Sequence, residues 1–277
     1  MTDLVVQGTV LPPDLNSTVD AACHPQRTRV ISDRAIRFES VGSLNGLDTY
    51  FAANRLDHAL VPAERKWSDF KLVVMDMDST LITIECIDEI ADMVGIKPQV
   101  AKITAAAMRG ELDFPDALRQ RVALLAGLEE GALQKVHDER LRLSPGAEVM
   151  LGTAKSAGMK TLLVSGGFTF FTNRLQARLG LDATLSNTLE IVDRRLTGKV
   201  LGAIIDADAK EARLRTMCRE LGCEPSQAIA IGDGANDLKM MRAAGVGIAY
   251  RAKPVVQAQA THSINHVGLD GVLALFA

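Results

Sequence analysis

The sequence has little of the material that several classes of protein require. Its 277 residues contain only four scattered cysteines, which is not the density of a disulfide scaffold. No apolar run is long enough to span a bilayer, and the start, MTDLVVQGTVLPPD, lacks the features of a signal peptide. No run of Lys and Arg occurs, and the net charge is −3. We therefore expect a cytoplasmic protein that binds neither nucleic acid nor membrane.

Three local patterns also lack the partners that would give them a ligand-binding role. Cys218 and Cys223 are five residues apart without a second pair, so we interpret them as small buried hydrophobic residues and not as zinc ligands. His262 and His266 are four apart without a third ligand, which favours a structural or surface role. GDGAND lacks the glycine spacing of a dinucleotide-binding turn.

Residues 1–66 differ in texture from the rest and predict a small α+β domain. LVVQGTV and RAIRFESVG are typical of strands, whereas DLNSTVDAA and LDTYFAANRLDHAL have helical spacing. VPAERKWSDF follows as a linker. The segment contains no ligand motif that we recognise in sequence, and we interpret it as a ligand-binding or dimerising module through which a homodimer could form.

From Leu72 onward, short apolar strands alternate with helices, and 47% of all residues are hydrophobic, enough for a large core. This order predicts an α/β fold with a doubly wound parallel sheet. A long insertion after the first strand has helical segments separated by glycines and predicts a helical bundle. LEIVDRRLTGKVLG, from Leu189, predicts a hairpin arm. The predicted parts are an N-terminal domain, a core and a cap: 1–66, 67–83 with 144–277, and 84–143.

Polar residues follow two of the predicted strands directly. KLVVMDMDSTL places Asp76 and Asp78 on one face of a strand tip, at the edge of the sheet where ligands bind. LLVSGGF ends a second strand with Ser165 and Gly166, where the backbone and the next helix start can hold a phosphate. A single Asp or a lone Ser-Gly-Gly would more often be an ordinary turn, so neither motif is decisive alone.

A third strand end, IAIGDGANDLKMM, adds Asp233, Asn236 and Asp237, although Asn236 or Asp237 alone could be a helix cap. If these strands are neighbours, several carboxylates crowd together and require a cation, and hard oxygen ligands favour Mg²⁺. Lys210 lies in the first turn of a helix that Asp206 or Asp208 could cap. With an anion nearby, we expect this lysine to contact it.

The motifs DMDST, VSGG, Lys210 and GDGANDLKM stand in the order found in the haloacid dehalogenase-like phosphohydrolases, which the chain resembles over about 160 residues and a cap inserted after the first motif. Within that superfamily, DMDSTLITIECIDEIA and AMRGELDFPDALRQRVALL resemble the first motif and the substrate-binding cap of phosphoserine phosphatases. The resemblance implies a Rossmann-like core, Mg²⁺ as the cofactor and phosphoserine as the small-molecule substrate.

The resemblance also implies a role for individual residues. Asp76 would be the nucleophile and Asp78 the general acid and base, and Mg²⁺ would be bound by Asp76, Asp233 and the backbone carbonyl of Asp78. Ser165, Gly166 and Lys210 would hold the phosphoryl group, with Asn236 and Asp237 supporting the phosphate and metal site. In the cap, four residues would contact or cover the substrate: Glu85 at its ammonium, Arg121 at its carboxylate, and Met108 and Phe114 closing over it.

Other functions stay open on the sequence alone. A related capped phosphatase acting on another small phosphomonoester, or a phosphotransferase, would carry the same motifs. A receiver-like signalling domain also phosphorylates an aspartate on such a sheet. Asp78 and the cap argue against that alternative, because a switch gains nothing from faster loss of its phosphate.

Overall fold

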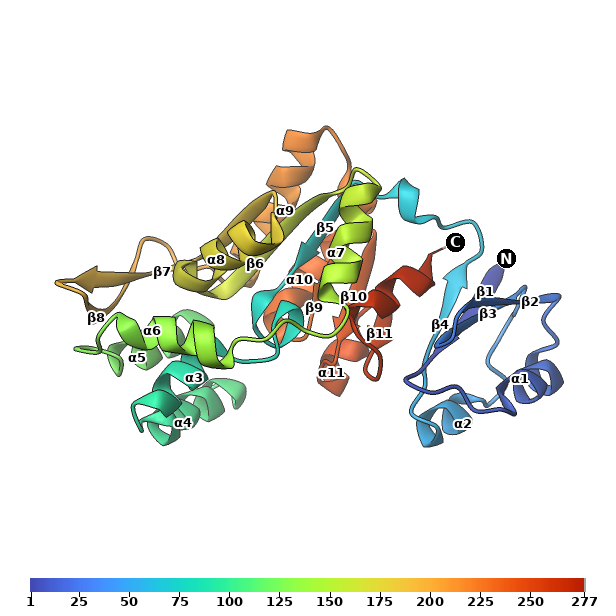
Figure 1. Cartoon of the computed structure of the whole chain (residues 1–277), viewed down its shortest axis with the longest axis horizontal. Helices are drawn as coiled ribbons and strands as arrows, with labels where there is room; N and C mark the ends of the chain where they lie inside the picture. Colours follow the sequence, from blue (N-terminus) through green and yellow to red (C-terminus); the bar gives the residue numbers. More distant parts are fainter. Residues whose placement is uncertain (277) are drawn as a thin grey trace.

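The computed structural model describes residues 1–276, apart from the side chain of Met108. Three groups of elements follow one another along the longest axis of the molecule (Figure 1). The N-terminal elements lie on the right, a sheet with helices on both faces lies in the centre, and the cap helices lie on the left. No helix among the described residues is long and apolar enough to cross a membrane.

The N-terminal elements form a small antiparallel sheet with two helices, as expected. Alternating strand residues separate two apolar faces. Leu4 and Phe38 pack with the helices, whereas Val5 and Val61 belong to the cluster that continues into the core. The strand order is β2-β3-β1-β4, and the elements are β1 (Thr2–Gln7), α1 (Leu15–Cys23), β2 (Arg27–Ser32), β3 (Ala35–Glu39), α2 (Asp48–Ala53) and β4 (Asp57–Pro62).

The helix expected over LDTYFAANRLDHAL is wrong in its second half. Helix α2 ends at Ala53, Arg55 takes a left-handed φ of 54°, and the chain continues as β4 from Asp57. A left-handed residue cannot continue a right-handed helix. Leu60 has apolar neighbours at helical spacing in sequence, but in β4 it pairs across the sheet with Leu4. Strand β2 (Arg27–Ser32), which pairs with β3, is a second feature that the sequence pattern did not indicate.

The central sheet confirms the doubly wound α/β core. Its order is β11-β10-β9-β5-β6-β7-β8, parallel except for the predicted hairpin β7–β8. The carboxyl ends of β9, β5 and β6 therefore meet at one edge. The strands are β5 (Leu72–Met75), β6 (Lys160–Phe168), β7 (Ala183–Val192), β8 (Arg195–Leu201), β9 (Ala228–Gly232), β10 (Val246–Tyr250) and β11 (His262–Ile264).

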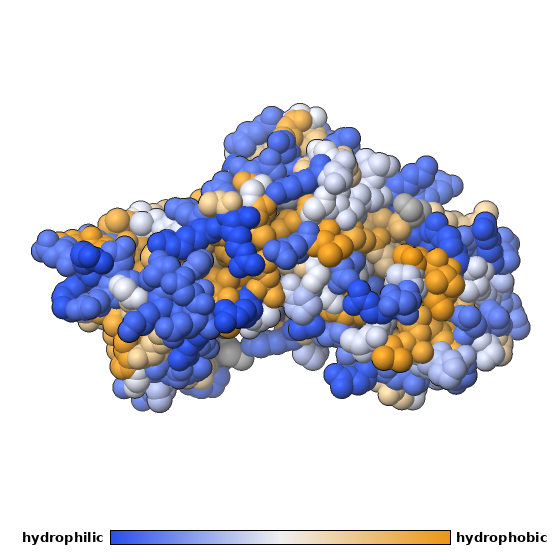
Figure 2. Space-filling view, in the orientation of Figure 1, coloured by the Kyte–Doolittle hydropathy of each residue, from blue (hydrophilic) through white to orange (hydrophobic). Residues whose placement is uncertain are grey.

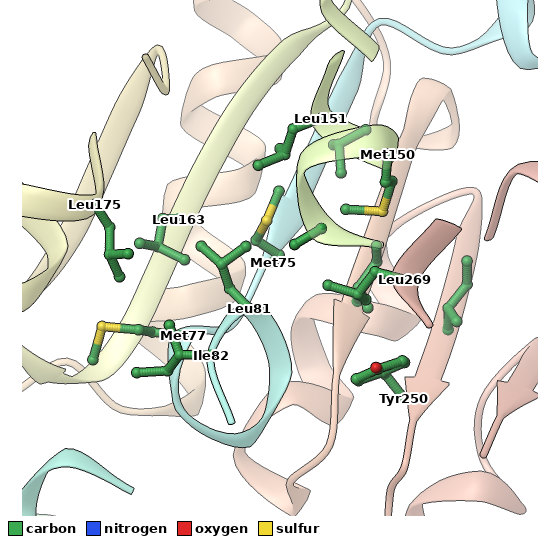
Figure 3. Packing of buried hydrophobic residues seen from close by; sticks show 14 of the residues in the cluster. Met75, Met77, Leu81, Ile82, Met150, Leu151, Leu163, Leu175, Tyr250 and Leu269 are labelled. Carbon is green, nitrogen blue, oxygen red and sulfur yellow. The ribbon is translucent and has the colours of Figure 1, made fainter. Parts of the chain in front are cut away.

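Helices cover both faces of this sheet and bury the alternating strand residues. Figure 3 shows Met75 and Leu81 lying between Leu163 of β6 and Met150 of α7. On the other face, Val74 packs against α9 and α10. The helices of the core are α7 (Ala147–Ser156), α8 (Thr169–Leu179), α9 (Ala207–Leu221), α10 (Leu238–Ala243) and α11 (Pro254–Gln257), with short 3₁₀ turns at Trp67–Asp69, Pro225–Gln227, Ala235–Asp237 and Leu269–Leu275.

The insertion after β5 is helical, as predicted. It contains α3 (Cys86–Met93), α4 (Lys97–Met108), α5 (Phe114–Ala123), α6 (Gly131–Lys135) and a π-helical turn, Val136–Arg140. The hairpin β7–β8 leaves the core and packs on this cap. Gly198 lies against Ala123 of α5, and Arg195 pairs with Glu129 at 2.8 Å.

The N-terminal domain is joined to the core by a specific polar contact as well as by apolar packing. Asp57, which is 3% exposed, accepts hydrogen bonds from the backbone N–H groups of Asn265, His266 and Val267 at 2.7 to 3.0 Å. His262 lies in β11, and Arg65 Nη1 contacts its Nε2 at 2.9 Å. Figure 2 shows hydrophilic residues over most of the visible face, with hydrophobic ones between the cap and the core.

Candidate active site

The site begins where β5, the central strand, ends. The chain makes one tight turn, Met77–Leu81, in which Asp78 is extended and Ser79 has a left-handed φ of 54°. Such a conformation costs a non-glycine residue about 1 kcal/mol, so the turn is held by its surroundings. The Ser79 hydroxyl donates to Glu85 Oε1 at 2.7 Å, and the Thr80 hydroxyl donates to Asp233 Oδ1 at 3.0 Å. These bonds tie the turn to the cap and to the end of β9.

Lys210 lies at the centre of the site. Asp206 caps α9 by accepting a hydrogen bond from the Ala209 N–H at 2.9 Å, which places Lys210 in the first turn of the helix. The fully buried Lys210 ammonium lies 2.9 Å from Asp76 Oδ1 and 2.7 Å from Asp237 Oδ1. Burial alone would lower the pKa of Lys210, but the charges of Asp237 and Asp76 raise it. Lys210 therefore stays charged at neutral pH.

Three carboxylates crowd around this lysine. Asp76, Asp233 and Asp237 each place an oxygen within 4.8 Å of the others. Burial and then the charge of Asp237 raise the pKa of Asp76 well above its ordinary value. Burial and the same neighbour raise the pKa of Asp233 to about 7. One ammonium does not compensate three carboxylates, and hard oxygen ligands in this number suit Mg²⁺.

Asp78 lies in the same turn, beyond the end of β5 and beside the end of β6. Its Oδ1 accepts a long hydrogen bond, 3.4 Å, from the backbone N–H of Cys86. A Cβ on Gly167 would lie 3.0 Å from Asp78 Oδ2 and 3.0 Å from Ser165 Oγ, so the absence of a side chain lets these groups approach. Burial and then the charge of Glu85 raise the pKa of Asp78 to about 8. Asp78 can therefore hold a proton near neutral pH.

The carboxyl end of β6 lies against the cap. Strand β6 runs through the two glycines to Phe168 before α8 begins, so the helix start is farther from Ser165 than the sequence pattern indicated. Ser165 is buried, and its Oγ accepts from the Gly167 N–H at 2.8 Å. A Cβ on Gly166 would lie 2.8 Å from Phe114 Cζ. The cap residue Phe114 thus reaches the predicted phosphate loop.

Glu85 and Arg121, two further predicted cap residues, lie around the same space. Glu85 precedes α3 and is held by Ser79, and Arg121 of α5 is half-buried with its Nε donating to the Ala117 carbonyl at 3.3 Å. Burial lowers the pKa of Arg121, while the charges of Asp88, Glu85 and Asp78 oppose this shift. The side chain of Met108 lies outside the described part of the structure.

Two residues that the sequence pattern did not indicate hold the site together. Asn187, a buried residue of β7, donates to the Gly166 carbonyl at 2.8 Å and accepts from the Ile205 N–H at 2.9 Å. It therefore links the carboxyl end of β6 to the segment that leads into α9. Thr80 positions Asp233 in a similar way. Asn236 lies in the 3₁₀ turn Ala235–Asp237, next to Asp237.

The sequence matches the haloacid dehalogenase-like hydrolases over residues 70–245, more than half of the chain. The chain therefore belongs to this family of enzymes, and the resemblance inferred from the four motifs is confirmed.

Within that family, the chain is similar to phosphoserine phosphatases. It is 55% identical over 215 residues to the phosphoserine phosphatase of Polaromonas sp., covering 76% of this chain and 91% of the relative. Identity to the phosphoserine phosphatase of Vibrio cholerae is 44%, over 83% of this chain and 70% of the relative.

Solved structures extend this similarity to the N-terminal domain. A haloacid dehalogenase family hydrolase of Salmonella enterica serovar Typhi has a TM-score of 0.89 at 32% identity, over 99% of this chain and 98% of that one. An unliganded probable phosphoserine phosphatase of Vibrio cholerae has a TM-score of 0.85 at 39% identity, over 99% and 86%. Both comparisons cover the N-terminal sheet, the core and the cap.

Proposed function

We propose that this enzyme hydrolyses O-phospho-L-serine to L-serine and phosphate, the last step of serine biosynthesis. The observation that carries the proposal is the buried Lys210 between Asp76 and Asp237, at a sheet edge to which the cap brings Phe114. The named phosphoserine phosphatases that share up to 55% identity with the chain support the choice of substrate.

Mg²⁺ fits the residues present. Asp76, Asp233 and the backbone carbonyl of Asp78 would hold the ion, and Asp237 would support it. Asp233 accepts one hydrogen bond, from Thr80, and forms no ion pair with any described residue. A bound cation would therefore compensate its negative charge. When bound, the ion would supply positive charge that offsets the repulsion between Asp76 and the phosphate dianion.

In the first step, a carboxylate oxygen of Asp76 attacks phosphorus in line, and the bond from phosphorus to the serine oxygen breaks. Asp78 donates its proton to that leaving oxygen. The pKa of about 8 keeps Asp78 protonated at neutral pH, which this step requires. The products of the step are serine and an aspartyl-phosphate at Asp76.

In the second step, the roles of the two aspartates change. Asp78, now ionised, accepts a proton from a water molecule, and the oxygen of that water attacks the phosphorus of the aspartyl-phosphate. The bond from phosphorus to Asp76 breaks, which releases inorganic phosphate and restores the carboxylate. Lys210 stays charged in both steps and stabilises the phosphoryl oxygens together with Ser165, Gly166 and Asn236.

The cap supplies recognition of the amino-acid part. Glu85 would pair with the substrate ammonium and Arg121 with its carboxylate, so each charge of the amino-acid part would meet a side chain of opposite charge. Phe114, with Met108, would close over the ligand and exclude bulk water. We also propose that the chain has three parts. Residues 1–66 form the N-terminal domain, residues 67–83 and 144–277 form the phosphatase core, and residues 84–143 form the cap.

A panel of phosphomonoesters tests the substrate. We expect Mg²⁺-dependent phosphate release from phosphoserine with a kcat/KM at least about tenfold above that for phosphothreonine and sugar phosphates. A faster reaction with another ester would assign the enzyme to the related capped phosphatases. Transfer of the phosphoryl group to an added alcohol, in place of water, would assign it to the phosphotransferases.

Arg121→Ala tests the recognition role when phosphoserine is compared with an aryl phosphate, which has no amino-acid part. Loss of a charge-assisted hydrogen bond predicts a decrease of about 30-fold in kcat/KM for phosphoserine and little change for an aryl phosphate. Arg119→Ala, an exposed arginine of the same helix, is the matched control. Equal losses on both substrates would remove Arg121 from substrate recognition.

We propose a homodimer through the N-terminal domain on the basis of its free sheet edge. Within residues 1–276, strand β2 pairs with β3 alone, and all its residues are exposed, with Val30 at 68% and Ile31 at 39%. Such an edge is a template for pairing with a second copy of the strand. Sedimentation of the protein and of Val30→Lys tests this, and a wild-type monomer at micromolar concentration would contradict it.

A further inference from the structure

The pairing of β6 with β7 is interrupted where the predicted phosphate-binding residues lie. Val164 pairs with Leu185 and the next pair is Phe168 with Asn187, so three residues of β6 lie opposite one residue of β7. These three residues, which we name the phosphate segment, are Ser165, Gly166 and Gly167. An interruption of this kind takes backbone groups out of the regular pairing, and they need other partners.

The peptide that joins Gly166 to Gly167 is held at both edges by side chains. Its carbonyl, on Gly166, accepts a hydrogen bond from Asn187 Nδ2 at 2.8 Å. Its N–H, on Gly167, donates to Ser165 Oγ at 2.8 Å. Because glycines flank this peptide on both sides, no Cβ restricts its rotation. These two hydrogen bonds therefore hold its orientation.

Asn187 also contacts the segment that precedes α9. Its Oδ1 accepts from the Ile205 N–H at 2.9 Å. Ile205 comes directly before Asp206, which caps the helix that carries Lys210. Asn187 is 1% exposed, so the loss of either bond would leave a buried polar group without its partner. One side chain thus fixes the phosphate segment and the start of α9 relative to each other.

This link lies behind the groups that would hold the phosphoryl group. In the proposed function, Ser165 and Gly166 bind that group from the end of β6, and Lys210 binds it from α9. Their spacing therefore depends on contacts between the two elements. A displacement of about 1 Å in such a constellation can cost a factor of about 100 in rate.

We propose that Asn187 is a positioning residue, which sets the orientation of the phosphate segment relative to Lys210 and thereby the affinity of the enzyme for the phosphoryl group. This role rests on the proposed function, because it assumes that these groups hold a phosphoryl group. It differs from the proposed roles of Glu85 and Arg121, which concern the amino-acid part of the substrate. Loss of the Asn187 amide should therefore affect all phosphomonoesters alike.

Inhibition by inorganic phosphate, measured with Asn187→Leu, tests this role. Leucine keeps the branched shape of asparagine but makes neither hydrogen bond. We expect the inhibition constant of phosphate to rise about tenfold, and kcat/KM to fall by a similar factor of about 30 for phosphoserine and for an aryl phosphate. An inhibition constant does not depend on how much of the enzyme is folded, so a purely structural role would lower the rate and leave this constant unchanged.

Ser186→Ala is the matched control. Ser186 is the neighbour of Asn187 in β7, and the substitution removes a hydrogen bond of 2.8 Å to Thr172. The inhibition constant of phosphate should be the same in this variant as in the wild type.

The outcomes separate this role from the proposed function. An unchanged inhibition constant in Asn187→Leu, with an active wild type, would overturn the positioning role alone. A larger loss for phosphoserine than for the aryl phosphate would also overturn it, because Asn187 would then act on the amino-acid part. A wild type that neither hydrolyses phosphomonoesters nor is inhibited by phosphate would refute the proposed function, and the positioning role with it.

A second variant covers the case in which Asn187→Leu does not fold. In Asn187→Ser the hydroxyl is too short to reach both partners, so the inhibition constant of phosphate should still rise, by about threefold or more. An unchanged constant in this variant would equally overturn the positioning role.

Discussion

Two groups of buried or half-buried carboxylates, one at the domain contact and one at the edge of the central sheet, are compensated in opposite ways. At the contact between the N-terminal domain and the core, both oxygens of Asp57 are used by three backbone N–H groups. At the edge of the central sheet, Asp76, Asp233 and Asp237 share Lys210 as their one nearby cation among the described residues. The first arrangement stabilises a domain contact. The second stores repulsion that a bound cation would relieve, and stored repulsion of this kind is typical of functional sites.

Asp76→Asn tests this difference with the largest expected effect. An amide is a poor nucleophile, so turnover of phosphoserine should fall by at least about 10⁴-fold. Because burial and Asp237 raise the pKa of Asp76, its ionised form destabilises the folded state at neutral pH. We therefore expect urea unfolding in EDTA to show a gain of about 1 kcal/mol in the variant.

The control for this measurement is Asp20→Asn, at an exposed position of α1. It should change neither turnover nor unfolding. A clear loss of stability in Asp76→Asn would show that attraction to Lys210 exceeds the repulsion from the other carboxylates. The carboxylates of both regions would then stabilise the fold, which would contradict the difference proposed between them.

Asp57→Ala should have the reverse effects of Asp76→Asn: lower stability and unchanged turnover. Removing the carboxylate leaves three backbone N–H groups, one buried and two half-buried, without their acceptor, which predicts a loss of about 3 kcal/mol in the free energy of unfolding. Turnover should be retained under conditions where the variant is folded, because Asp57 lies outside the catalytic edge. Urea unfolding beside Asp20→Ala measures the effect, and a loss no greater than in that control would show that Asp57 does not stabilise the contact.

The parts of the fold predicted from sequence are those whose signal is local. The buried run before Asp76 and Asp78 is a strand, and Asp206 caps the helix of Lys210, because both patterns depend on a few adjacent residues. LDTYFAANRLDHAL was misjudged because its apolar residues fit a helix, whereas pairing of β4 with β1 determines the outcome.

The parts of the site that escaped prediction depend on long-range contacts. Asn187 resembles any polar residue of an alternating strand until the sheet brings it between Gly166 and Ile205. Thr80 is one of several hydroxyl residues near Asp78, and only the pairing of β5 with β9 places it beside Asp233. Asp57 likewise meets residues 265–267 only after the N-terminal domain docks on the core.

His262 gives the domain contact a pH dependence that the catalytic edge does not share. It is 8% exposed, and burial and then the charge of Arg65 lower its pKa to about 4. Its pKa in the unfolded chain is about 6.5, so the unfolded state takes up the proton first as the pH falls. The stability due to neutral His262 is therefore complete above pH 6.5 and is lost progressively toward pH 4, by at most about 3 kcal/mol.

Urea unfolding of the wild type and His262→Gln between pH 7 and about pH 4.5 measures the contribution of His262 to the free energy of unfolding. The carboxylates titrate alike in both proteins, so their contribution cancels when the two free energies are subtracted. We expect the stability of the wild type to fall more steeply than that of the variant. His24→Gln, at an exposed position, should follow the wild type. Parallel curves for wild type and His262→Gln would show that His262 is as free to ionise in the fold as in the unfolded chain, and the contact with Arg65 would then not hold it neutral.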